Sequence, residues 1–151
     1  MGELPAYNNL GLLYQSGNGI KQDYKKAFKY FKLAADKGYV ISENNLGYMY
    51  ENGLGTKQDY NKAYLYYKIA ADKGYERGQY NLAFSYEKGN GVKQNYEKAI
   101  KYYKLAAEKG ETLALTSLGF LFQNGLGVNK DYKKSFEYYK LASDMGDGFA
   151  Q

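Results

Sequence analysis

Apolar residues near the start of the chain follow a helical spacing, and a second helical pattern begins after a short glycine loop. Ala6, Leu10 and Tyr14 fall at i, i+4 and i+8, which predicts one stripe of a helix that ends at Gly17. Asp23 stands at the N-cap of the next helix, where its carboxylate can accept hydrogen bonds from first-turn amides. That second helix carries one broad apolar arc, made of Ala27, Tyr30, Phe31, Ala34 and Ala35.

This helix–loop–helix unit recurs along almost the whole chain. The interval from Leu10 to Leu46 is 36 residues, and Leu82 and Leu118 continue it. A period of this size is typical of a stacked helical solenoid. We therefore expect one all-α domain over residues 2–151. The expected units are about 6–38, 42–74, 78–110 and 114–146, with the start of a fifth at 147–151.

Positions that recur in the units predict local structure. The N-cap position holds Asp23, Asp59, Asn95 and Asp131, and the residues expected to end the second helices are Gly38, Gly74, Gly110 and Gly146. A mid-helix glycine costs roughly 1 kcal/mol, so its recurrence predicts a close approach by the backbone of a neighbouring helix. These glycines are Gly11, Gly47 and Gly119. Leu33, Ile69, Leu105 and Leu141 lie to the side of the apolar arc and predict a second packing partner.

Composition narrows the class of protein. The chain has 151 residues, a net charge of +5 and no Cys, His or Trp. The absence of Cys removes disulfide and thiolate chemistry. Mean hydropathy is −0.69 and no long apolar run occurs, so we expect no membrane insertion. The first residues lack the pattern of a signal peptide, which favours the cytoplasm.

Candidate catalytic chemistry is sparse. The glycine loops could suggest a phosphate site, but that motif needs a strand before the loop, and here a helix precedes it. Without His or Cys, an enzyme would have to use carboxylates, lysines or tyrosines. Glu51 with Glu87 is the one pair that could share a site, and no further groups assemble around it. We therefore expect a protein that is not an enzyme, with no cofactor and no metal site.

The spaced matches in each unit carry a family resemblance. Repeat 2 shows the pattern through Leu46, Gly47, Tyr50, Gly53, Gly55, Asp59, Lys62, Ala63, Tyr66, Tyr67, Ala70, Ala71 and Gly74. This pattern resembles the Sel1-like repeat, a relative of the tetratricopeptide repeat. The departures are Thr56, Ala83, Asn95, Phe122 and Ser135. The resemblance implies a right-handed α/α superhelix that acts as an adaptor or scaffold, and the bridging cysteines of the family's secreted branch are absent.

In related superhelices the first helix of each repeat, here the A helix, lines the concave side. The face opposite Ala6, Leu10 and Tyr14 then carries an apolar row, which we name the A-helix row: Leu12, Tyr48, Phe84 and Phe120. Its polar borders are Asn8, Gln15, Asn44, Glu51, Tyr80, Glu87, Thr116 and Gln123. Such side chains can hold a peptide or a partner domain. The alternative is that the row packs inside the protein, as helical aromatic stripes often do.

The positive net charge of the chain makes an RNA-binding helical repeat the second hypothesis. The basic residues of the second helices, however, are interleaved with Asp36, Asp72, Glu108 and Asp144, which is typical of a solvated face. They are Lys26, Lys62, Lys98, Lys134, Lys32, Lys68, Lys104 and Lys140. We therefore expect a protein or peptide partner rather than nucleic acid. Neither terminal repeat carries a polar cap, which predicts either that the chain is a segment of a longer array or that its open ends meet other molecules, as in end-to-end self-association.

Overall fold

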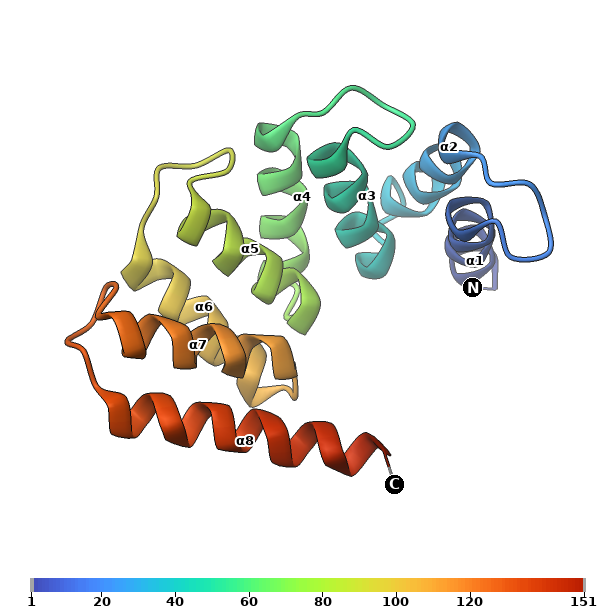
Figure 1. The fold of residues 1–151 in the computed structure, drawn as a ribbon. Coiled ribbons are helices and arrows are strands. Elements are labelled where there is room, and N and C mark those ends of the chain that lie inside the picture. The colour runs from blue at the N-terminus through green and yellow to red at the C-terminus, as the bar shows by residue number, and fades with distance from the viewer. Residues whose placement is uncertain (1, 151) are drawn as a thin grey trace. The chain divides into compact units, whose positions relative to one another are not determined.

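The computed structural model describes residues 2–150, which form eight α-helices joined by short loops (Figure 1). The described residues contain no strand. The helices are α1 (Glu3–Ser16), α2 (Tyr24–Ala35), α3 (Val40–Asn52), α4 (Tyr60–Asp72), α5 (Glu76–Lys88), α6 (Tyr96–Glu108), α7 (Thr112–Asn124) and α8 (Tyr132–Ala150). The chain divides into two compact units, Met1–Tyr75 and Glu76–Gln151. The predicted all-α repeat fold is confirmed.

Each A helix ends, and each second helix begins, through the residues that the sequence indicated. Gly17 adopts the left-handed conformation with φ 74°, and its N–H donates to the Leu13 carbonyl oxygen. The Lys26 N–H then donates to Asp23 Oδ1 at 3.0 Å. The same N-cap bond recurs at Asp59, Asn95 and Asp131. The N-cap prediction is therefore confirmed in all four repeats.

A glutamine ties each of the first three loops to the helices on both sides. Gln22 Nε2 donates to the Gln15 carbonyl oxygen at 2.8 Å and to the Tyr24 hydroxyl oxygen at 3.0 Å. Gln58 and Gln94 make the same pair of bonds one and two repeats later. These bonds engage backbone carbonyls at the helix ends, which have no partner inside the helix. They therefore stabilise the exit of the chain from the A helix.

The mid-helix glycines accommodate an aromatic ring from the second helix. A Cβ atom at Gly11 would lie 2.5 Å from the Phe31 ring, and one at Gly47 would lie 2.6 Å from the Tyr67 ring. Gly119 faces Tyr139 in the same way. The prediction of a close approach is therefore correct, but the approaching group is a side chain. The expected backbone contact is wrong, because helices that pack through a large ring stay further apart.

Packing between successive repeats builds the core of each unit. In the first unit Phe31 and Ala35 of α2 are buried with Leu46 and Met49 of α3. Ile100 of α6 is buried in the second unit, as are Leu118 and Leu121 of α7 and Tyr103 of α6. A repeat of two helices cannot cover its own apolar surface, so the next A helix completes each core.

Two predictions about the second helices are corrected. Leu33, Ile69 and Leu141 are exposed and Leu105 is half-buried, so this position does not make the second packing contact. On α2, Phe28 makes that contact instead, with its ring edge-on to Tyr50 of α3 at 5.3 Å between centroids. Phe28 lies five residues before Leu33 and therefore on nearly the opposite side of the helix.

Gly146 does not end α8. Gly38, Gly74 and Gly110 all have positive φ and close their helices, whereas Gly146 lies inside α8 and is not among the positive-φ glycines. Glycine permits a left-handed turn without imposing one. At Gly38 the turn is held by the bond from the Tyr39 N–H to the Ala34 carbonyl oxygen. Residues 147–150 continue α8 and Gln151 lies outside the described residues, so the fifth unit stays a prediction.

Candidate functional site

The A-helix row divides between the two units. In the first unit Leu12 of α1 and Tyr48 of α3 are 42% and 44% exposed. Phe120 of α7 is 46% exposed in the second unit, and Phe84 of α5 is half-buried. The row is therefore open to solvent rather than packed in the core. This observation favours the docking hypothesis over the packing alternative that the sequence left open.

Some of the polar residues expected to border the row are structural. Asn8 is buried, and its Oδ1 accepts hydrogen bonds from Ser42 Oγ at 2.9 Å and from Asn45 Nδ2 at 3.0 Å. These bonds join α1 to α3. Asn44 is buried as well. The helical spacing placed Asn8 and Asn44 on the open face, but the hydrogen bonds from α3 hold the Asn8 side chain in a buried position.

Glu87 is buried too, whereas the other five border residues are more accessible. Gln15, Glu51 and Tyr80 are half-buried, while Thr116 and Gln123 are exposed. Gln123 Oε1 accepts a hydrogen bond from the Tyr139 hydroxyl at 3.2 Å. The face is therefore a mixture of solvent-facing groups and of groups already bonded to the second helices.

The Glu51 carboxylate holds the aromatic ring that lies over Gly47. Glu51 Oε2 accepts a hydrogen bond from the buried Tyr67 hydroxyl at 2.9 Å. Burial raises the pKa of Glu51, while the Tyr67 hydrogen bond acts in the opposite direction. Burial, followed by the nearby Glu51 charge, raises the pKa of Tyr67 far above its ordinary value. The raised pKa keeps the Tyr67 hydroxyl protonated near neutral pH, so it can donate this hydrogen bond.

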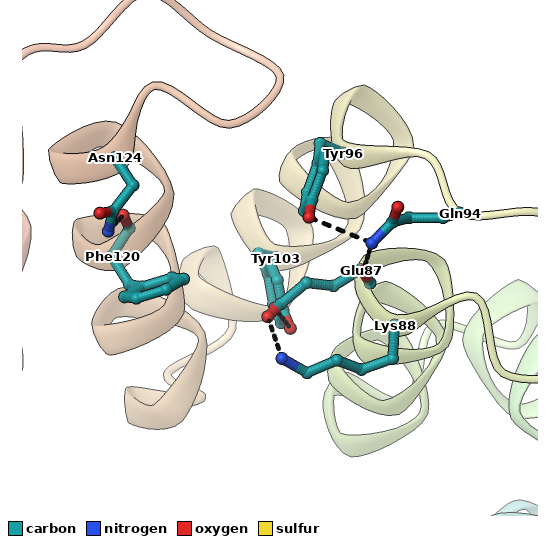
Figure 2. A network of polar contacts seen from close by, with 7 residues as sticks. All are labelled: Glu87, Lys88, Gln94, Tyr96, Tyr103, Phe120 and Asn124. Carbon is teal, nitrogen blue, oxygen red and sulfur yellow. Dashed lines mark hydrogen bonds and ion pairs between the residues drawn. The ribbon is translucent and has the colours of Figure 1, made fainter.

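Glu87 has the same role in the second unit and also pairs with a lysine. Glu87 Oε2 accepts a hydrogen bond from the Tyr103 hydroxyl at 2.6 Å, and Glu87 Oε1 lies 2.9 Å from Lys88 Nζ (Figure 2). Lys88 Nζ is also 5.5 Å from the centre of the Phe84 ring. Lys88 was not predicted, although its place four residues after Phe84 puts the two side chains on one helix face.

A hollow of about 360 Å³ lies beside this cluster in the second unit. Figure 2 shows the Phe120 ring projecting from α7 toward Glu87 and Lys88 of α5. Its lining combines rings, hydroxyl groups and one charged pair: Phe84, Glu87, Lys88, Thr116, Ser117, Phe120 and Tyr139. Ser117 and Tyr139 were not predicted, because Ser117 is not a position of the A-helix row or its borders and Tyr139 belongs to the second helix α8. Apolar walls with a few polar groups are suited to hold a side chain of a partner.

The lysines of the second helices lie against rings of the A helices. Lys26 Nζ is 5.2 Å from the centre of the Tyr14 ring, and the equivalent contact recurs in the other three repeats. Lys32 Nζ pairs with Asp36 at 2.8 Å. Exposed pairs of this kind contribute little to stability, but each gives its lysine a partner within the protein. The predicted solvated face agrees with these contacts.

The possible catalytic pair is not assembled within either unit. Glu51 belongs to the first unit and Glu87 to the second, and each bonds to a tyrosine of its own repeat. Among the described residues, no group of three or more His, Cys, Asp or Glu could hold a metal ion. Within the same residues, no helix is both long and apolar enough to cross a membrane.

Comparison with known proteins identifies the family. The Sel1 repeat model matches residues 4–39, 40–75, 77–111 and 112–147, which covers nearly the whole chain. The chain belongs to the Sel1 repeat family. Sel1 repeats generally form non-catalytic scaffolds for protein–protein interaction. No protein with a curated function matches this sequence significantly.

Solved Sel1 repeat structures resemble this chain closely. One is a protective antigen of uropathogenic Escherichia coli strains, with 36% identity, a TM-score of 0.89, and coverage of 96% of this chain and 31% of the antigen. Another is a Sel1 repeat protein from Oxalobacter formigenes, with 34% identity, a TM-score of 0.90, and coverage of 97% of this chain and 60% of that protein. The chain thus spans only part of the length of both proteins.

A more distant relative is named for its cysteine content. Helicobacter pylori cysteine rich protein B is 27% identical, with a TM-score of 0.62, and the match covers 74% of this chain and 86% of that protein. The present chain contains no cysteine. No disulfide can therefore cross-link its Sel1 repeats.

Proposed function

We propose that this chain is a non-catalytic interaction module that binds a peptide or a partner domain along the A-helix row. The observation that carries the proposal is the exposure of Leu12, Tyr48 and Phe120 at equivalent positions of the A helices. Single exposed apolar residues are common on protein surfaces. Recurrence at one helix position is different, because it offers a partner repeated apolar contacts.

The chemistry of the second unit supports an apolar or aromatic anchor on the partner. Phe84 and Phe120 supply rings on two sides of the hollow, and Thr116 and Ser117 supply hydroxyl groups. Glu87 accepts a hydrogen bond from Tyr103 and pairs with Lys88, so both of its oxygens already have partners within the chain. A ring inserted here would gain apolar contact, while backbone groups of a peptide could bond to the hydroxyls.

A binding experiment with matched variants tests this proposal. Proteins retained by the immobilised chain are identified, and the strongest purified partner is titrated against Tyr48→Ala, Phe120→Ala and Leu65→Ala variants. Leu65 is an exposed apolar residue of α4 outside the row, so its variant controls for the loss of any exposed apolar group. We expect each row variant to weaken binding about tenfold or more, as for a buried interface anchor. Equal affinity of all three variants would refute the proposal.

RNA binding is tested with the same preparations. Titration with single-stranded RNA over a range of salt concentrations separates the two hypotheses, because phosphate contacts make affinity fall steeply with salt. Under the present proposal RNA binds weakly or not at all. Tight binding that is lost at high salt and is unchanged in Phe120→Ala would instead support the RNA hypothesis.

A further inference from the structure

A second hollow in the second unit gathers lysines from three separate elements. It has a volume of about 410 Å³ and lies where α6, the loop after α7 and the first turn of α8 meet. Lys104 belongs to α6, Lys130 to the loop and Lys134 to α8. Asp131 is the acidic residue of the lining, so three lysines and one aspartate give a net charge of +2. We name this site the lysine hollow.

In the first unit, lysines at two of these positions are paired with carboxylates. Lys32, at the position of Lys104, pairs with Asp36 at 2.8 Å. Lys62, at the position of the α8 lysine, lies 3.6 Å from the N-cap Asp59. The three lysines of the hollow form no ion pair with any carboxylate whose side chain the structure describes. The hollow therefore holds positive charge that the protein itself does not compensate.

Lys130 distinguishes the fourth loop from the other three. Gln22, Gln58 and Gln94 hold the equivalent position, and each donates to a carbonyl oxygen and to a tyrosine hydroxyl. In the described part of the chain Lys130 makes neither bond, and its Nζ lies 5.7 Å from the centre of the Tyr132 ring. The fourth loop thus loses a stabilising group and gains a cation. Departures of this kind from a favourable local pattern are typical of binding sites.

The lysine positions stay accessible where a further repeat follows. Lys26, at the position of Lys134, belongs to α2, against which α3 packs, and its side chain is 57% exposed. Lys104 is itself exposed although α7 packs against α6. A repeat packed on α8 would therefore leave the lysine hollow open.

The N-terminus of α8 does not make the site. Asp131 Oδ1 accepts the N-cap hydrogen bond from the Lys134 N–H at 2.9 Å, as in the other repeats. A carboxylate therefore already occupies the helix end. An anion in the hollow would bind to the lysine side chains, whose surroundings differ from those in the first unit.

We propose that the lysine hollow binds the phosphate group of a phosphorylated side chain on a partner protein. A phosphate monoester is close to a dianion at neutral pH and has three strong acceptor oxygens. Three ammonium groups from three elements can each donate a charge-assisted hydrogen bond to it. The choice of a protein as the carrier of the phosphate rests on the proposed function.

Nucleic acid fits the lysine hollow less well. Single-stranded nucleic acid needs a groove of cations that follows its backbone, with exposed rings on which bases stack. The ring in the hollow is Phe122, which is 5% exposed and lies 5.4 Å from Lys134 Nζ. Outside the hollow, Lys26, Lys32 and Lys62 are paired with carboxylates. The arrangement therefore favours one isolated phosphate group.

The first measurement is a titration of the whole chain with a capped tripeptide, alanine–phosphoserine–alanine, followed by two-dimensional NMR. We expect saturable shifts at the amides of residues 128–134, and none with the unphosphorylated tripeptide. Affinity should rise from about pH 5 to about pH 7.5, because the second pKa of the phosphate is about 6. Shifts spread evenly over the lysines of all repeats, or no shifts at all, would overturn the proposal.

A matched pair of variants locates the site. Lys130→Gln installs the residue of the other three loops, and should lower the affinity for the phosphorylated tripeptide about tenfold, as for loss of a charged hydrogen bond. Lys93→Gln removes the same charge from the exposed loop after α5, outside the hollow, and should leave the affinity unchanged. Equal losses in the two variants would indicate attraction by net charge alone and would overturn the proposal.

Stability separates a binding role of Lys130 from a structural one. Lys130→Gln restores the loop glutamine, whose partners in this repeat would be the Gln123 carbonyl oxygen and the Tyr132 hydroxyl. Its urea midpoint is therefore expected to equal or exceed that of the parent chain while phosphate binding falls. A lower midpoint that accounts for the lost binding would overturn the assignment.

Competition distinguishes the carrier of the phosphate and the two proposals. Single-stranded RNA that displaces the tripeptide at concentrations below the dissociation constant of the tripeptide would overturn the choice of a protein ligand. The tripeptide has no apolar anchor, so its binding does not depend on the A-helix row. A tripeptide that fails to bind therefore overturns the phosphate site alone. Partner capture that is unaffected by Tyr48→Ala and Phe120→Ala counts against the row alone.

Discussion

The first and second repeats of the N-terminal unit have closely similar sequences but differ in what covers them. Leu46 is fully buried in α3, where it lies between repeats, whereas Leu10 of α1 is 37% exposed. Gly55 approaches the backbone of α2, and Gly19 approaches nothing. Tyr67 bonds to Glu51, while Phe31 stands at the same place in the first repeat without a hydroxyl. Equivalent residues therefore have different energetic roles that depend on their neighbours.

The largest difference is expected for the two leucines. Leu46→Ala should lower the free energy of unfolding by about 2–5 kcal/mol, because it leaves a cavity in the packed core. Leu10→Ala should cost less than about 1 kcal/mol, since part of its side chain already contacts water. Urea denaturation followed by circular dichroism measures both values at low protein concentration. Similar losses for the two variants would show that the open face of α1 is covered in solution.

The loop glycines give a smaller difference. Gly19→Ala and Gly55→Ala both force alanine into the left-handed region, which costs roughly 1–2 kcal/mol. In Gly55→Ala the added methyl group also meets the backbone of Tyr24 and Lys25, which should add about 1–3 kcal/mol. Thermal and urea unfolding of the two variants, measured side by side, give the excess directly. An excess near zero would mean that the loop moves away from α2 without loss.

The smallest effect concerns pH. The pKa of Glu51 is raised above its ordinary value of 4.5, so the folded state holds its proton to higher pH than the unfolded state does. The resulting contribution of Glu51 to the free energy of unfolding is complete below pH 4.5 and is lost as the pH rises through the raised pKa. Glu51→Gln should remove that slope in the pH dependence of unfolding. Tyr67→Phe should extend it to higher pH, because the hydroxyl that favours the carboxylate is gone.

Local features of the fold could be predicted well from the sequence. Asp23 and its equivalents cap helices because the bond spans only three residues, and Gly17 ends α1 because its conformation is a property of glycine. The period of 36 residues also predicted the repeats, which the Sel1 repeat matches bear out. Gly146 was misjudged, because a turn such as the one at Gly38 depends on the neighbouring backbone bonds as much as on the glycine itself.

The candidate site could be predicted only in part. Leu12, Tyr48 and Phe120 are exposed, in agreement with the hypothesis of a docking row, and whether they bind a partner stays a prediction. Asn8 and Glu87 were assigned to the open face but are buried. Helical spacing gives the direction in which a side chain points, whereas burial depends on how close the next helix lies.

The sequence by itself determined the helix starts with their N-caps, the loops and the number of repeats, since the caps and loops depend on residues close together in the chain and the repeats on a fixed period. Tertiary structure decided which copy of a repeated residue is buried. It placed the rings of Phe31 and Tyr67 over Gly11 and Gly47, and it left Phe136 exposed where Ile100 is covered. The physical reason is that burial depends on the neighbouring helix. Repeats of the same sequence have equivalent neighbours only when another repeat packs on each of their two sides.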